Sequence, residues 1–146
     1  MELFLDADGC PVTGLAVTLA RQYHVPCTIL CDTAHELSYP GARTVTVSKG
    51  ADSVDFALVN LVKKGDLVVT QDYGLAAMCL SRGAVPIHQD GMVYTPENID
   101  SLLFFRAAAR KIRKAGGRLK GPSRRTPEQD RAFAATLERL LREAAP

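Results

Sequence analysis

Short apolar runs alternate with helix-like segments between Leu3 and Ile87 of this 146-residue chain. The runs are Leu3–Leu5, Pro26–Cys31, Val45–Val47, Asp66–Thr70 and Ala84–Ile87. Between most of them, apolar residues recur every three or four positions, which is the spacing of a helix buried on one side. Strands that alternate with helices form a parallel sheet whose right-handed crossovers cover both faces. The sequence therefore predicts a single α/β domain with three α/β/α layers around a central, mostly parallel sheet.

Two further helices are expected after the last strand, and Pro11 is expected to open the first helix of the chain. Thr95-Pro96 opens a helix that runs to about Ala115, and Thr126-Pro127-Glu128-Gln129 reads as a capping box that opens the last one. The residues expected to pack on the core are Leu102, Phe105, Ala109 and Ile112 in the first of these, and Phe133, Leu137, Leu140 and Leu141 in the second. Residues 96–146 thus form a helix–loop–helix extension of the single domain 1–146.

This extension is strongly basic. From Arg106 to Arg125 there are nine basic residues and no acidic one. The other 9 basic and all 16 acidic residues give the rest of the chain a net charge of −7. A polyanion such as RNA suits this division of charge. The basic strip would hold its phosphates, and the acidic body would bind a metal ion that reaches them. Arg106, Arg110 and Arg113 follow one helix face and are candidates to contact nucleic acid, although a merely solvated face has the same pattern.

Aspartates lie where the predicted strands end or the helices begin. They are Asp6 and Asp8 after the first run, Asp52 and Asp55 at a helix start, and Asp72 after the fourth run. The carboxyl ends of the strands in an α/β sheet meet at one edge, where ligands bind. Carboxylates gathered there repel each other unless a cation joins them, and hard oxygen ligands favour Mg²⁺ or Mn²⁺. The sequence therefore predicts a divalent-metal site built from these five aspartates.

Structural roles remain open for single members of this set. Asp8 is also placed to cap the helix near Pro11, and Asp52 to complement the dipole of its own helix. Asp66 begins a strand, is expected to face solvent, and is left out of the site. Ser48, Lys49 and Thr70 lie beside the aspartates in the sequence and are candidates to contact a phosphate or ligand oxygen.

Taken together, these motifs resemble a known bacterial family. The matching segments are DADGCPV (6–12), KGADSVDFALV (49–59), GDLVVTQDYGLAAMCLSRGA (65–84), NIDSLL (98–103) and GP (121–122). They are similar to the YaiI/YqxD family, whose members are regarded as PIN-like and related to metal-dependent ribonuclease domains. The resemblance implies catalytic roles for Asp6, Asp8, Asp55 and Asp72, the last within the T-x-D motif Thr70-Gln71-Asp72. Asp52 has no firm counterpart in that pattern.

The leading hypothesis is a nuclease that hydrolyses RNA with Mg²⁺ or Mn²⁺, and two alternatives stay open. The segment from Phe4 to Gly9 resembles the D-x-D-G opening of haloacid-dehalogenase phosphatases, with Asp6 as the nucleophile and Asp8 as the acid/base. However, Gly65-Asp66 precedes its strand, whereas the late acidic motif of those phosphatases follows one. The third hypothesis is a non-catalytic RNA-binding or regulatory domain that works through the basic segment.

The compartment is predicted from three absences. Asp6 and Asp8 interrupt any N-terminal signal peptide, and no apolar run is long enough to span a membrane. Cys27 and Cys31 have the spacing C-x3-C without a second pair, so reduced, buried thiols are expected rather than a zinc site. The sequence therefore predicts a cytoplasmic protein, and it leaves a homodimer open.

Overall fold

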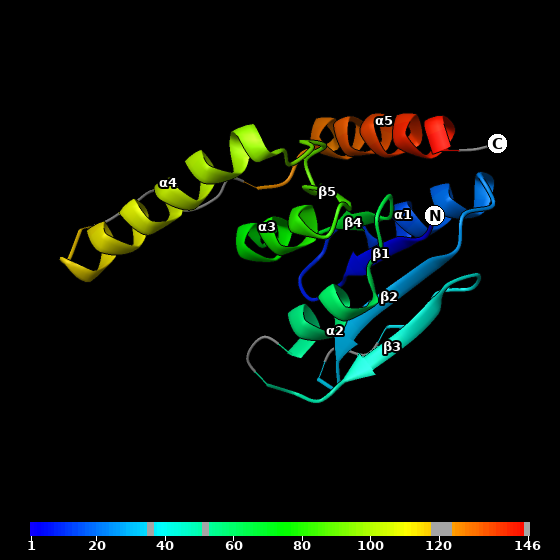
Figure 1. The fold of residues 1–146 in the computed structure, drawn as a ribbon, viewed down its shortest axis with the longest axis horizontal. Helices are drawn as coiled ribbons and strands as arrows, with labels where there is room; N and C mark the ends of the chain where they lie inside the picture. Colours follow the sequence, from blue (N-terminus) through cyan, green and yellow to red (C-terminus); the bar gives the residue numbers. More distant parts are fainter. Residues whose placement is uncertain (35–36, 51–52, 118–123, 145–146) are drawn as a thin grey trace.

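The computed structural model describes residues 1–34, 37–50, 53–117 and 124–144. Its elements are β1 (Leu3–Asp6), α1 (Thr13–Gln22), β2 (Cys27–Asp32), β3 (Arg43–Val47), α2 (Ser53–Leu61), β4 (Leu67–Val69), α3 (Tyr73–Ser81), β5 (Val85–Ile87), α4 (Pro96–Lys114) and α5 (Pro127–Ala144). The five strands form one sheet in the order β3-β2-β1-β4-β5, and all neighbouring strands are parallel (Figure 1). The predicted fold class is confirmed, and the three-layer arrangement is consistent with a PIN-like fold.

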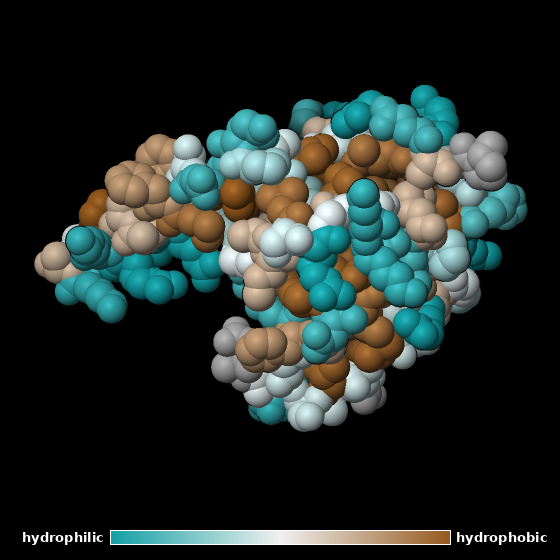
Figure 2. Space-filling view, in the orientation of Figure 1, coloured by the Kyte–Doolittle hydropathy of each residue, from teal (hydrophilic) through white to brown (hydrophobic). Residues whose placement is uncertain are grey.

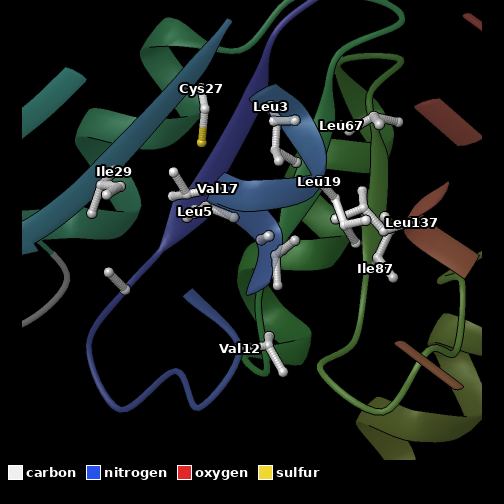
Figure 3. Packing of buried hydrophobic residues seen from close by; sticks show 14 of the residues in the cluster. Leu3, Leu5, Val12, Val17, Leu19, Cys27, Ile29, Leu67, Ile87 and Leu137 are labelled. Carbon is white, nitrogen blue, oxygen red and sulfur yellow. The ribbon is translucent and has the colours of Figure 1, made fainter. Parts of the chain in front are cut away.

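The central strand β1 is buried on both faces, as expected of a parallel sheet covered on both sides. Leu3 and Leu5 point into a core formed with α1 and α5, where they pack with Val17 and Leu137 (Figure 3). Phe4 points the other way, into a core formed with α2 and α3. Burying a side chain of this size stabilises the fold by roughly 1.5–3 kcal/mol. The two cores together hold β1 firmly in place, and with it the residues that follow its carboxyl end.

The order of the strands places a switch point between β1 and β4. From β1 the chain moves outward to β2 and then β3, and it returns through α2 to β4 on the other side of β1. The connections therefore leave the carboxyl ends of β1 and β4 in opposite directions. In open α/β sheets the crevice at such a point is the usual place for a ligand.

Helix α5 packs along the body beside α1 (Figure 1). It begins at the predicted capping box, since the Thr126 backbone N–H donates to Gln129 Oε1 over 2.8 Å and the Gln129 N–H donates to Thr126 Oγ1 over 3.4 Å. Of the predicted stripe, Phe133, Leu137 and Leu141 are fully buried, and Leu140 is partly buried against the same core. The sequence pattern of this helix therefore predicted both its start and its buried face.

Among the residues that the structure describes, helix α4 packs on the body through its first turns. Ile99 is buried against α3 in a small cluster with Ala76 and Tyr94. The prediction that Phe105 and Ile112 pack on the core was wrong, because their side chains are 66% and 45% exposed. The reason is that α4 extends beyond the sheet, so that its later turns project from the body (Figure 1).

Three local expectations can be compared with the structure. Helix α1 begins at Thr13 and not at Pro11, because the residues before it form a turn in which the Cys10 N–H donates to the Ala7 carbonyl. Asp66 does not face solvent: it is only 6% exposed and accepts hydrogen bonds from backbone N–H groups. Cys27 and Cys31 are buried free thiols, as expected. None of the described helices is long and apolar enough to cross a membrane.

Candidate functional site

A cavity of about 480 Å³ lies at the carboxyl edge of the sheet. Its acidic lining residues are Asp6 at the end of β1, Asp8 just beyond it, Asp32 at the end of β2, Asp55 in α2 and Asp72 before α3. Arg106 of α4 also lines the cavity. In Figure 2 the outline of the molecule is hollowed between the projecting α4 and the part of the body that holds α2. The fold thus brings four of the five predicted aspartates into one cavity, and Asp52 lies outside the described residues.

Thr70 joins two of these aspartates. Its hydroxyl donates a hydrogen bond to Asp6 Oδ2 over 2.8 Å and accepts one from the Asp72 backbone N–H over 3.0 Å. Thr70 is buried, and its carbonyl accepts a hydrogen bond from the hydroxyl of the buried Tyr94. The Thr70 hydroxyl proton is thus directed to Asp6, and the contact of Thr70 with a phosphate or ligand oxygen stays a prediction. The geometry of Thr70 fixes the distance between the ends of β1 and β4.

Asp6 occupies an unfavourable place for a charge. Burial raises the pKa of its carboxyl group from 3.8 to about 6, against the opposing effect of the hydrogen bond from Thr70. The negative charges of Asp8 and Asp72 contribute smaller parts of the same rise. A cation in the cavity would offset both the burial and the repulsion, and it would lower the same pKa.

Asp72 is the N-cap of α3, and this local role determines how its carboxylate is presented. Oδ1 accepts hydrogen bonds from the backbone N–H groups of Gly74 (2.9 Å) and Leu75 (3.2 Å). Arg106 Nη1 lies 3.5 Å from the same oxygen. Oδ2 has no hydrogen-bond partner among the described residues. Asp72 therefore keeps one oxygen for the cavity while the other anchors the helix.

Asp8, just beyond the end of β1, lies beside Asp32 at the end of β2. The Asp32 backbone N–H lies 3.5 Å from Asp8 Oδ1, and Asp32 Oδ1 accepts a hydrogen bond from the Ala34 N–H over 2.9 Å. Asp55 stands in the first turn of α2. Within the described ranges, no three His, Cys, Asp or Glu side chains converge closely enough to enclose a metal ion. The cavity is thus acidic, but its described carboxylates do not form a closed metal-binding cluster.

The predicted basic and polar residues divide into two groups. Arg106 lines the acidic cavity, and together with Arg110 it lines a smaller hollow of about 260 Å³ on α4. Arg113 is exposed further along the same helix. Ser48 and Lys49 are exposed and do not line the acidic cavity, although the adjacent residues at its rim do.

The last arginine of the basic run has a structural role. Arg125 Nη1 lies 2.6 Å from Asp90 Oδ1, and its Nε lies 2.8 Å from Asp130 Oδ1. Its Nη2 donates to the Gln89 carbonyl over 2.7 Å. These contacts tie the start of α5 to the loop after β5. Arg125 is therefore not part of a basic surface. Most of the described basic residues of the run lie on α4, and Arg124 is exposed just before α5.

Sequence reasoning missed Asp32. The signal was present, because Asp32 ends the buried run Cys27–Cys31 in the same way that Asp6 ends the first run. It was overlooked because none of the sequence segments that carry the resemblance includes it. Its place at the end of β2, next to β1, puts it on the same edge of the sheet.

The fold and the cavity define a class: an α/β protein with a parallel sheet and an aspartate-lined cavity at its switch point. Within that class the chain belongs to the YaiI/YqxD family, since the family profile described as "Uncharacterized BCR, YaiI/YqxD family" matches residues 4–143. The UPF0178 protein of Exiguobacterium sibiricum is 51% identical over 143 residues, which are 98% of each chain. That of Clostridium acetobutylicum is 46% identical over 143 residues, 97% of each chain. Comparison with solved structures gave no match.

Proposed function

We propose that the protein is a metal-dependent nuclease that hydrolyses phosphodiester bonds in RNA. The observation that supports this most directly is the meeting of aspartates from β1, β2, α2 and the start of α3 in one cavity at the switch point. Nothing in the folding of a parallel sheet requires carboxylates from four separate elements to face each other, and their repulsion opposes folding. A bound divalent cation removes that repulsion.

The chemistry of the donor set fits Mg²⁺ or Mn²⁺. Mg²⁺ is usually held by one or two carboxylates and retains several waters, so it does not need a closed cage of protein ligands. In this proposal Asp6 and Asp72 bind the ion directly, and Asp8 and Asp55 bind it directly or through water. Asp52 is a further candidate beyond the described residues. When bound, such an ion supplies an activated water and stabilises the leaving oxygen.

The surrounding residues would hold the substrate and the ligands in place. Thr70 orients Asp6 and the start of α3 through its two hydrogen bonds. Arg106 can exchange its contact with Asp72 for a phosphate oxygen once a cation neutralises that carboxylate. Arg110 and Arg113 continue along α4 and would follow the sugar–phosphate backbone. Ser48 and Lys49 would contact the strand outside the cavity.

The test is cleavage of a fluorescent single-stranded RNA in the presence of Mn²⁺. The Asp6→Asn protein should cut at least about 100-fold more slowly, which is the usual scale for losing a group that acts directly in the chemistry. The matched control is Asp100→Asn, an exposed aspartate on α4 that should leave the rate unchanged. Equal cleavage by wild type and Asp6→Asn would contradict the proposal.

The same preparation separates the alternatives. A nuclease should leave a small phosphomonoester intact. Hydrolysis of that ester with a phosphate adduct on Asp6 would instead indicate a phosphatase. Binding of RNA without cleavage in Mn²⁺ or Mg²⁺ would indicate a non-catalytic RNA-binding domain.

A further inference from the structure

A second cavity, of about 410 Å³, adjoins the acidic one. The two share Asp55, Asp72 and Arg106 as lining residues. Their other linings differ in character, because the second cavity is lined mainly by apolar side chains of α2 and α3. The apolar residues are Phe56, Leu75 and Met78. One cavity thus offers carboxylates and the other an apolar surface, with a guanidinium at the border between them.

Phe56 is the unusual member of this surface. Its neighbours on α2, Val54 and Leu58, are buried in the core, whereas the ring of Phe56 is 64% exposed. Met78 of α3 is 37% exposed beside the same cavity. A large aromatic side chain on the solvent side of a short helix contributes little to folding. Its position beside a charged cavity is typical of a residue that contacts a ligand.

A nucleotide has the same division as the two cavities. Its phosphate is charged and suits a metal and an arginine, and its base presents flat apolar faces that stack on aromatic side chains. Arg106 stands at the border, where it can contact a phosphate while the attached base reaches the apolar side. A base that is paired within a duplex cannot enter such a cavity without leaving the stack.

We propose that the second cavity binds one unpaired nucleobase, stacked on Phe56 and flanked by Met78, next to the phosphate held at the aspartates. This inference rests on the proposed nuclease function and assigns its substrate class, which is single-stranded nucleic acid. The aromatic surface makes few demands on base identity, since every base has two flat faces. The site therefore selects for single strands and not for sequence.

The test compares two strands of eight phosphorothioate linkages, which resist hydrolysis and keep the charge. One has bases, and the other has only sugars and phosphates. Their dissociation constants are measured in Mn²⁺ by fluorescence anisotropy. Wild type should bind the strand with bases more tightly. Phe56→Ala should weaken that binding about 5- to 150-fold, the range for stacking one base on an aromatic side chain, and should leave the strand without bases unaffected. Phe56→Trp should keep the preference.

Phe105→Ala is the matched control, because Phe105 is an equally exposed aromatic on α4 that lines neither cavity. It should leave both constants unchanged. An identical preference for bases in wild type and Phe56→Ala would overturn the base site and leave the nuclease proposal intact. Failure of wild type to bind either strand would overturn both proposals. A dimer that dissociates on Phe56→Ala, seen by sedimentation, would show that the apolar cavity receives a second copy, and it would also overturn the base site.

Discussion

Asp66 and Asp6 are carboxylates at opposite edges of the same sheet, and their surroundings differ. At the amino edge, Asp66 accepts hydrogen bonds from the backbone N–H groups of Glu2 (2.9 Å) and Lys63 (2.8 Å), one on each oxygen. At the carboxyl edge, Asp6 has the single hydroxyl of Thr70 and faces other carboxylates. The first aspartate therefore stabilises the chain where β1 and β4 begin. The second is held where its charge is unfavourable, which is typical of a ligand-binding group.

The largest effect is expected from removing the aspartate at the amino edge. Asp66→Ala removes the acceptor of two part-buried hydrogen bonds, which come from the backbone N–H groups of Glu2 and Lys63, at a cost of about 1–3 kcal/mol each. We expect urea unfolding to show a loss of about 3 kcal/mol in the free energy of unfolding. Asp100→Ala, at an exposed position, should change it by less than about 0.5 kcal/mol. A loss below 1 kcal/mol for Asp66→Ala would mean that water replaces these bonds.

In metal-free buffer, removing the charge of Asp6 at the carboxyl edge should increase the free energy of unfolding, whereas Asp66→Ala lowers it. The pKa of Asp6 is raised from 3.8 to about 6 in the folded protein, so the folded state holds the proton more tightly than the unfolded state does. This contribution to stability is fully present below pH 3.8 and is lost as the pH rises through about 6. Asp6→Asn keeps an acceptor for Thr70 without the charge. It should be more stable than wild type above pH 6, by about 3 kcal/mol. Parallel curves of stability against pH would contradict this.

A bound divalent cation should offset the loss of stability that the charge of Asp6 causes. At ten times its dissociation constant, Mn²⁺ should stabilise wild type by about 1.4 kcal/mol through mass action. Asp72→Asn should remove the effect while keeping the cap of α3, because Asn is also a good N-cap residue.

Metal affinity should fall as the pH drops below about 6, since the proton on Asp6 competes with the ion. Calorimetry at pH 5 and pH 7.5 measures both effects. Equal metal affinity at pH 5 and pH 7.5 would show that Asp6 does not bind the ion.

The smallest effects are expected from the arginines of α4. Arg106→Gln removes the cation that neutralises Asp72, so Mn²⁺ should bind more tightly by no more than about fivefold, the value of an exposed ion pair. Arg113→Gln should leave metal binding unchanged. Each variant should lower the slope of log K for RNA against log salt by about one if its arginine contacts a phosphate. An unchanged slope for Arg113→Gln would show that Arg113 is a solvated side chain that contacts no phosphate.

The sequence predicted most of the fold because strands buried on both faces and helices with one apolar stripe leave clear patterns. The apolar stripe of α5 was correctly assigned to the core, whereas the stripe of α4 was not. Both helices are amphipathic, and periodicity identifies a face without saying whether a neighbour covers it. Phe105 and Ile112 remain exposed because the sheet ends before α4 does.

The site was predictable in part, because the order of the strands determines which strand ends meet at one edge of the sheet. Asp6 and Asp72 end or follow buried strands, so the parallel topology alone brings them to one edge. Asp32 obeys the same rule and was passed over. Asp66 was misassigned because a carboxylate before a strand gives no sign, in the sequence, of the backbone N–H groups that will surround it. Hydrogen bonds between residues 64 positions apart are a property of the folded chain.

The sequence by itself determined the parallel α/β architecture, the family, and the concentration of carboxylates at the ends of strands. These properties depend on the periodicity of apolar residues and on the order of the strands and helices along the chain. Both can be read directly from the sequence. Only the tertiary structure decided that Thr70 links Asp6 to the start of α3, that Arg106 faces Asp72, and that Phe56 remains exposed beside them. Such pairings depend on where the strands and helices come to lie in space, and that is set by packing in two cores on opposite faces of the sheet.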